Sequence, residues 1–98
     1  MSKIKSKSKL KRRKVIFSLE SPDAKEVVLM GDFNQWNPKK HPMKKNDNGV
    51  WEKTTLLFPG RYEYRFLVDN QWKNDPKNKQ LCSNSFGSKN NFITVPST

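Results

Sequence analysis

Cysteine and histidine are almost absent from this sequence, which has one of each, Cys82 and His41. A single cysteine excludes an internal disulfide, and one cysteine with one histidine does not make a structural metal site. One histidine also gives little basis for a Ser/His/Asp catalytic set. The sequence gives neither side chain an evident partner, and we expect neither a metal nor a cofactor.

Long apolar runs and phosphate-binding glycine loops are missing as well. No stretch has the length of a membrane span, and the N-terminus lacks the apolar core and cleavage site of a signal peptide, so we expect a cytoplasmic protein without membrane contact. The nine acidic residues are scattered, and Asp32, Asp69 and Asp75 lie beside expected turns, where local hydrogen bonding is their usual role. Because no carboxylate pair stands out, we do not expect an enzyme.

Positive charge is concentrated at the N-terminus. The formal net charge is +11, and residues 1–14 hold eight of the 20 basic side chains and no acidic one. The remaining twelve basic and nine acidic residues leave a net charge of +3, which is ordinary for a soluble domain. A Ser/Lys-rich run cannot bury apolar surface, so we expect a disordered basic arm at residues 1–13 and one folded domain at residues 14–98. Nucleic-acid or anionic-surface binding through this arm stays open as an alternative function.

Short alternating runs separated by Gly, Pro, Asn and Asp predict an all-β domain. The clearest run, at residues 61–68, places an aromatic and apolar face on one side, made of Tyr62, Tyr64, Phe66 and Val68. Trp51 continues a second alternation with Leu57, and we expect it in the core. About seven short strands in some ninety residues fit an immunoglobulin-like β-sandwich.

Two tryptophans, Trp36 and Trp72, lie instead among polar residues and prolines. A pyranose has C–H groups on its faces and hydroxyls on its rim, so an aromatic ring can cover the face while polar side chains meet the rim. The pattern alone leaves open whether these tryptophans bind a sugar or plug the end of the sandwich. Arg65 points away from the expected core, either toward a ligand or into an ion pair with Glu63 or Glu52.

Four segments resemble the motifs of the glycogen-binding domains, carbohydrate-binding module family 48. They are "GxFNxW" at residues 31–36, "PGxYxYKFxVD" at 59–69 with Arg65 in place of the lysine, "xWxxDP" at 71–76 and "GxxNN" at 87–91. This family includes domains of AMP-activated protein kinase β subunits and the N-terminal early-set domains of isoamylase and branching enzymes. The order and spacing of the motifs over residues 14–95 imply the early-set, immunoglobulin-like fold.

The resemblance implies a non-catalytic module that binds an α-glucan such as glycogen, starch or maltooligosaccharides. Trp36 and Trp72 would stack on glucose rings, and Arg65 would donate to sugar hydroxyls in place of a family lysine. A planar guanidinium differs in geometry from an ammonium, so the preference for chain length can differ too.

The loop at residues 86–90 completes the implied site. Asn90 would hydrogen-bond the sugar, Ser88 stands where the kinase modules have a threonine, and Phe86 takes the place of a leucine beside the glucan. By its burial habit Phe86 is equally suited to packing inward at the base of the loop.

A binding module of this kind acts by localising or regulating a partner, for example a kinase or a glucan-metabolising enzyme. A second function also stays open, in which the sandwich is a protein-interaction scaffold that uses its strand edges and binds sugar only incidentally.

Overall fold

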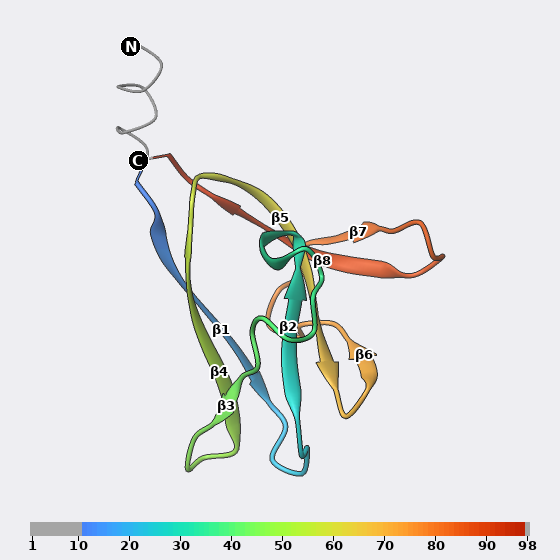
Figure 1. Cartoon of the computed structure of the whole chain (residues 1–98). Helices are drawn as coiled ribbons and strands as arrows, with labels where there is room; N and C mark the ends of the chain where they lie inside the picture. Colours follow the sequence, from blue (N-terminus) through green and yellow to red (C-terminus); the bar gives the residue numbers. More distant parts are fainter. Residues whose placement is uncertain (1–10, 98) are drawn as a thin grey trace.

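The computed structural model describes residues 11–97, which form two antiparallel β-sheets (Figure 1). Residues 1–10 of the expected basic arm lie outside the described residues, and the first strand begins at Arg13, the last residue assigned to that arm. The elements in chain order are β1 (Arg13–Glu20), β2 (Val27–Gly31), the 3-10 helix η1 (Asp32–Asn34), β3 (Lys44–Lys45), β4 (Val50–Leu57), β5 (Gly60–Val68), β6 (Gln71–Lys73), β7 (Leu81–Ser83) and β8 (Lys89–Val95).

The two sheets have different sizes. The smaller sheet has the strand order β1-β4-β3. The larger sheet has the order β2-β5-β8-β7, and β6 pairs with β5 beside β8. The prediction of an all-β, immunoglobulin-like sandwich is confirmed. The described chain has eight strands, where the sequence predicts about seven. The strands β3 and β7 could not be recognised, because two or three residues are too few to show an alternation.

The core lies between the two sheets. Phe17 and Leu19 of β1 and Trp51 and Leu57 of β4 face the apolar side of the larger sheet. Trp51 is 7% exposed, and its indole Nε1 donates to the Ser21 carbonyl oxygen at 2.8 Å, so the polar end of this buried ring is satisfied. The prediction that Trp51 belongs to the core is confirmed.

Strand β5 organises the larger sheet. Tyr64, Phe66 and Val68 are buried against the core, as the alternation predicts, and the residues between them face outward. One edge of β5 pairs with β2, and the other is shared by β8 along residues 60–64 and β6 along residues 66–68. Figure 1 shows β6 and the β7–β8 hairpin on the same side of β5. The outer face of β5 is therefore bordered by β2 on one side and by β6 and β8 on the other.

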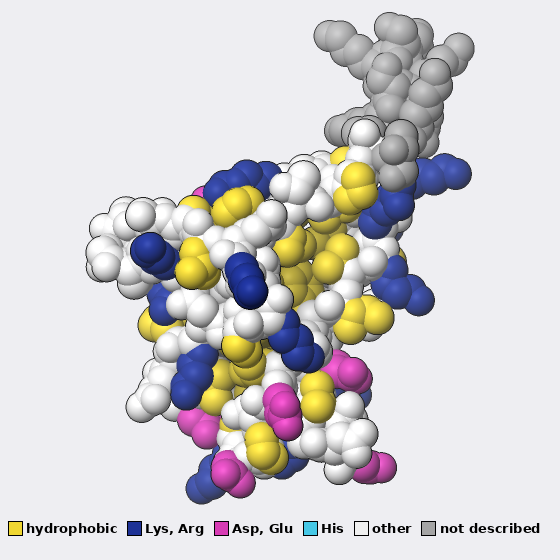
Figure 2. Space-filling view, turned by 180° about the vertical axis from the view of Figure 1, so that it is seen from behind, with side chains coloured by type: hydrophobic (Ala, Val, Ile, Leu, Met, Phe, Trp, Pro, Cys, Tyr) yellow, Lys and Arg dark blue, Asp and Glu magenta, His cyan; other side chains and the backbone are white. Residues whose placement is uncertain are grey.

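Positive charge is dispersed over one face of the described residues. Figure 2 shows Lys and Arg side chains spread over the face seen from behind, with an apolar strip exposed between them. Within residues 11–97 no helix combines the length and the apolar character that crossing a bilayer requires.

Candidate functional site

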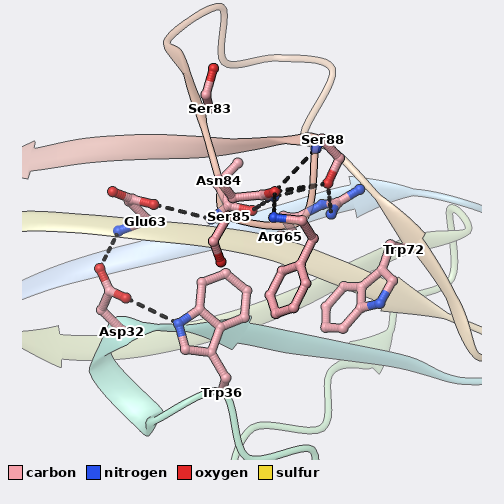
Figure 3. Close-up of a pocket in the computed structure, with 11 residues that line it drawn as sticks. Asp32, Trp36, Glu63, Arg65, Trp72, Ser83, Asn84, Ser85 and Ser88 are labelled. Atoms are coloured by element: carbon pink, nitrogen blue, oxygen red, sulfur yellow. Dashed lines mark hydrogen bonds between the residues drawn. The ribbon is translucent and has the colours of Figure 1, made fainter.

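A cleft of about 610 Å³ opens on the outer face of the larger sheet (Figure 3). It brings together the six side chains that the sequence singled out, which come from four separate segments. The lining consists of Asp32, Trp36, Glu63, Arg65, Trp72, Ser83, Asn84, Ser85, Phe86, Ser88 and Asn90.

Trp36 reaches the cleft from a tight turn that follows β2 and η1. Gln35 and Trp36 both have a φ of 56°, a left-handed conformation that is uncommon for residues other than glycine. The turn is closed by the Trp36 backbone N–H, which donates to the Gly31 carbonyl oxygen at 3.0 Å. Such a conformation is kept only where its surroundings determine it, so the turn depends on the contacts beneath it.

Asn34 supplies those contacts from a position that is 1% exposed. Its Oδ1 accepts from the Gly31 N–H at 3.1 Å, and its Nδ2 donates to the Leu29 carbonyl oxygen at 2.9 Å and to His41 Nδ1 at 2.7 Å. Asn34 is therefore the partner of His41, which the sequence alone does not indicate. The amide nitrogen faces Nδ1, so this ring nitrogen accepts and the proton of the neutral imidazole lies on Nε2. Burial, followed by the charges of Lys53 and Lys40, lowers the pKa of His41 below its ordinary value.

Gly31 is required at the end of β2 by close approach. A Cβ atom there would lie 2.7 Å from Phe33 Cζ and 2.8 Å from the Glu63 carbonyl oxygen. Any larger residue would push the turn away from β5.

Trp72 reaches the cleft from β6 and is 47% exposed. Its ring centroid lies 6.2 Å from that of Trp36 with the planes at 66°, and Arg65 Cζ lies 5.4 Å from its centroid. Neither tryptophan belongs to the buried core cluster, so the alternative that they plug the end of the sandwich is wrong. The two rings form adjoining, inclined surfaces.

Arg65 projects from the outer face of β5 beside Trp72. Its Nη1 donates to Ser88 Oγ at 3.2 Å, while Nε is buried and has no hydrogen-bond partner among the described residues. Within residues 11–97 the ion pair found is Arg61–Glu63, at 2.9 Å, so the alternative pairing of Arg65 with an acidic residue is wrong. The remaining guanidinium N–H groups are therefore not committed to a carboxylate.

The turn between β7 and β8 is built around Asn84. Its Oδ1 accepts from the backbone N–H groups of Phe86 and Ser88, and its Nδ2 donates to Ser88 Oγ at 2.9 Å and to Asn90 Oδ1 at 3.1 Å. Gly87, with a φ of 81°, completes the turn. Phe86 at the tip is 91% exposed, so the alternative that it packs inward is wrong.

Asn90 forms part of the base of the cleft and is 7% exposed. Its Nδ2 donates to Glu63 Oε1 at 3.1 Å, and the other Glu63 oxygen accepts from Arg61. These contacts, the Asn90 amide first, lower the pKa of Glu63 below its ordinary value. Asn90 therefore links the hairpin to β5, and a sugar contact by its remaining N–H stays a prediction.

The cleft includes residues that sequence reasoning does not assign to a site, namely Asp32, Glu63, Ser83, Asn84 and Ser85. The sequence indicates only a turn role for Asp32, and it does not reveal the Asn84–Ser88 turn because the strand before it has three residues. The Asn-x-x-Gly spacing of Asn84 and Gly87 is the signal that points to such a turn. Within residues 11–97 no group of three or more His, Cys, Asp and Glu side chains is placed to hold a metal ion.

Comparison with known protein families gives one match that spans the described domain. The profile described as the glycogen recognition site of AMP-activated protein kinase matches residues 13–98.

Several curated proteins are similar to the chain. Protein FLOURY ENDOSPERM 6, chloroplastic, of Oryza sativa subsp. japonica is 37% identical over 86 residues, which cover 88% of this chain and 16% of that protein. Protein PTST homolog 2, chloroplastic, of Arabidopsis thaliana is 42% identical over 72 residues, which cover 74% of this chain and 13% of that protein. The 1,4-alpha-glucan branching enzyme GlgB of Bacillus subtilis is 42% identical over 60 residues, which cover 55% of this chain and 9% of the enzyme. The chain thus spans less than a fifth of the length of each of these relatives.

Proposed function

Because the chain belongs to the family of the glycogen recognition site of AMP-activated protein kinase, we propose that its cleft binds an α-glucan such as glycogen, starch or a maltooligosaccharide. The observation that carries this proposal is the convergence of Trp36, Trp72 and Phe86, from three separate segments, on one cleft with a polar lining. Family membership and the composition of the cleft lead to the same ligand class.

The chemistry of the lining suits a sugar chain. Aromatic faces cover the C–H faces of glucose rings, while the Arg65 guanidinium lies within the same cleft to meet hydroxyl groups. The Ser88 hydroxyl is engaged within the protein, because its Oγ accepts from Arg65 and Asn84 and donates to Asn84 Oδ1. The 66° between the planes of Trp36 and Trp72 suits a chain that curves, as α-1,4-linked glucose does, better than a flat ribbon. An open cleft that buries little surface gives modest affinity.

We propose that no reaction follows binding. Two carboxylates lie in the cleft, and both are engaged: each oxygen of Asp32 and of Glu63 accepts a hydrogen bond from the protein. A glycosidase needs one carboxyl group to protonate the leaving oxygen and another to act as base or nucleophile. The match to the Bacillus subtilis branching enzyme, which covers 9% of that enzyme, supports an accessory role for such a segment.

The biological role that we propose is to localise or regulate a partner, such as a kinase or a glucan-metabolising enzyme, on the glucan. The relatives are several times longer than the matched segment, so in them the module is joined to other sequence. The cytoplasmic location expected from the sequence stays a prediction.

Protein interaction is a second candidate, and the outer face of the smaller sheet favours it. Ile16, Leu56 and Phe58 are each more than half exposed there, on the strands β1 and β4 and just after β4. This apolar surface lies on the sheet opposite to the one that carries the cleft, so the two functions are compatible.

Affinity electrophoresis tests the proposed function. The full chain is run in native gels that contain glycogen, amylose, cellulose-derived soluble β-glucan or no polysaccharide. We expect retardation by glycogen and amylose and none by the β-glucan. Equal mobility in all four gels would overturn the proposal, and equal retardation by the β-glucan would overturn the α-glucan specificity.

A further inference from the structure

We propose that Asp32 is a positioning residue of the glucan site, which fixes the Trp36 indole against strand β5; this inference rests on the proposed function. Asp32 is the first residue of η1 and directly follows the last residue of β2. Its carboxylate lies between the indole and β5 (Figure 3). No contact between Asp32 and the sugar is needed for this role.

The geometry gives each carboxylate oxygen its own donor. Asp32 Oδ1 accepts from Trp36 Nε1 at 3.0 Å, and Oδ2 accepts from the Glu63 backbone N–H at 2.9 Å. Hydrogen bonds accepted by a carboxylate are shorter and stronger than those between neutral groups, and the two bonds together connect the indole to β5.

The second of these bonds continues the pairing of the sheet. The register of β2 with β5 ends at Gly31 opposite Tyr64, and the next N–H of β5 that faces this edge belongs to Glu63. The Asp32 side chain accepts from it where a strand carbonyl would otherwise do so. Trp36 is thereby attached to the strand that carries Arg65, which lines the same cleft.

The bond to the indole determines how Trp36 is presented. The turn at Gln35 and Trp36 is left-handed, and without a side-chain tether the indole would sample several rotamers. With Nε1 engaged by Asp32, the ring offers a face to the ligand, and its N–H is not a donor to sugar. A fixed ring loses less conformational entropy on binding, which raises affinity.

An alternative role for Asp32 is direct acceptance of a sugar hydroxyl, since a carboxylate can accept more than two hydrogen bonds. The two roles differ in their dependence on the indole N–H. A positioning role needs that N–H, whereas a direct contact does not.

The test is a double-mutant cycle with Asp32→Asn and Trp36→Phe, read by the Kd for maltoheptaose. Asparagine has the same shape and keeps one oxygen for the Glu63 N–H, but it cannot serve both donors. We expect Asp32→Asn to weaken binding about tenfold when Trp36 is present and less than about twofold in the Trp36→Phe background, because phenylalanine has no N–H to hold. We also expect the Trp36 Nε1–H resonance of the free protein to move in Asp32→Asn.

Asp69→Asn is the matched control. Asp69 also accepts backbone N–H groups, those of Lys25 and Glu26, but it is not part of the cleft. This control should leave the Kd unchanged. An equal loss of affinity in the parent and in the Trp36→Phe background, or no loss in either, would overturn the positioning role. Failure of the parent chain to bind maltoheptaose would overturn the proposed function instead, while the shift of the Trp36 resonance would still report the Asp32 bond.

Discussion

The Trp36 and Trp72 rings meet edge to face, with centroids 6.2 Å apart and planes inclined at 66°. Trp36 comes from the turn after β2 and Trp72 from β6, so the pair exists only in the folded sheet. Edge-to-face contact is a favoured arrangement of aromatic rings, and together with the Asp32 bond to the Trp36 indole it sets the angle between the two surfaces. The ligand is therefore met by two inclined planes, and a curved chain fits them.

Removing either ring should weaken glucan binding and preserve the fold. We expect Trp36→Ala and Trp72→Ala each to cost about 2 kcal/mol or more in binding, roughly thirtyfold in Kd, measured by calorimetric titration with maltoheptaose. Phe58→Ala is the matched control, because Phe58 is an exposed aromatic residue outside the cleft. If both tryptophan variants bind like the Phe58→Ala variant, the assignment of the site is wrong.

Trp51 should behave in the opposite way. Its side chain is in the core and its Nε1 donates to Ser21, so Trp51→Ala should lower the free energy of unfolding by about 3–5 kcal/mol in a urea titration. Trp72→Ala serves as the comparison and should change the free energy of unfolding by less than about 1 kcal/mol. A Trp51→Ala protein with the urea midpoint of the parent would contradict the packing described for β4.

His41 should make stability depend on pH. Burial lowers its pKa in the folded chain below the ordinary value of the unfolded chain, so the unfolded state binds the proton more readily. The contribution of His41 to the free energy of unfolding is complete above about pH 6.5, the ordinary pKa of histidine. It is lost as the pH falls through the lower pKa of His41 in the folded chain. The Lys53 and Lys40 charges act in the same direction, and protonated Nδ1 can no longer accept from Asn34.

We expect the urea concentration at the unfolding midpoint to decrease as the pH is lowered from about 7.5 to about 5.5, the range in which histidine titrates. His41→Gln should reduce this dependence, because a glutamine oxygen can still accept from Asn34 and does not take up a proton. A variant with the full pH dependence of the parent would assign the effect to other groups.

The N-terminal segment should contribute to polyanion binding and not to glucan binding. Deleting residues 1–10 removes four lysines and leaves β1 intact. We expect retention on heparin to decrease, and the remaining retention to weaken steeply from about 50 to about 200 mM salt. Glycogen retardation should be the same with and without the deletion. Its loss on deletion would show that the segment takes part in the glucan site.

Most of the fold could be predicted from the sequence, because the period-two alternation of a strand shows which of its faces is buried. Trp51, Tyr64 and Phe66 lie inside as expected. The strands β3 and β7 could not be predicted, because two or three residues carry no period and their pairing is set by neighbours distant in sequence.

The site could be predicted in its aromatic members but not in the contacts that hold them. Polar surroundings mark Trp36 and Trp72 as surface residues. The roles of Asn34, Asn84 and Asp32 depend on which backbone groups the fold leaves unpaired near them, and that is a property of tertiary structure. The partner of His41 could not be predicted for the same reason, since Asn34 is fixed by the turn.

The three indole Nε1–H resonances of the full chain, followed by ¹H–¹⁵N NMR as maltoheptaose is added, report directly whether a glucan enters the cleft. Trp36 and Trp72 lie in the cleft, whereas the Trp51 Nε1 is bonded to Ser21 beside the core and serves as an internal control. If the cleft binds the sugar, the resonances of Trp36 and Trp72 move together along one saturation curve while that of Trp51 stays in place. Stationary resonances for both Trp36 and Trp72 at saturating sugar would contradict glucan binding in the cleft.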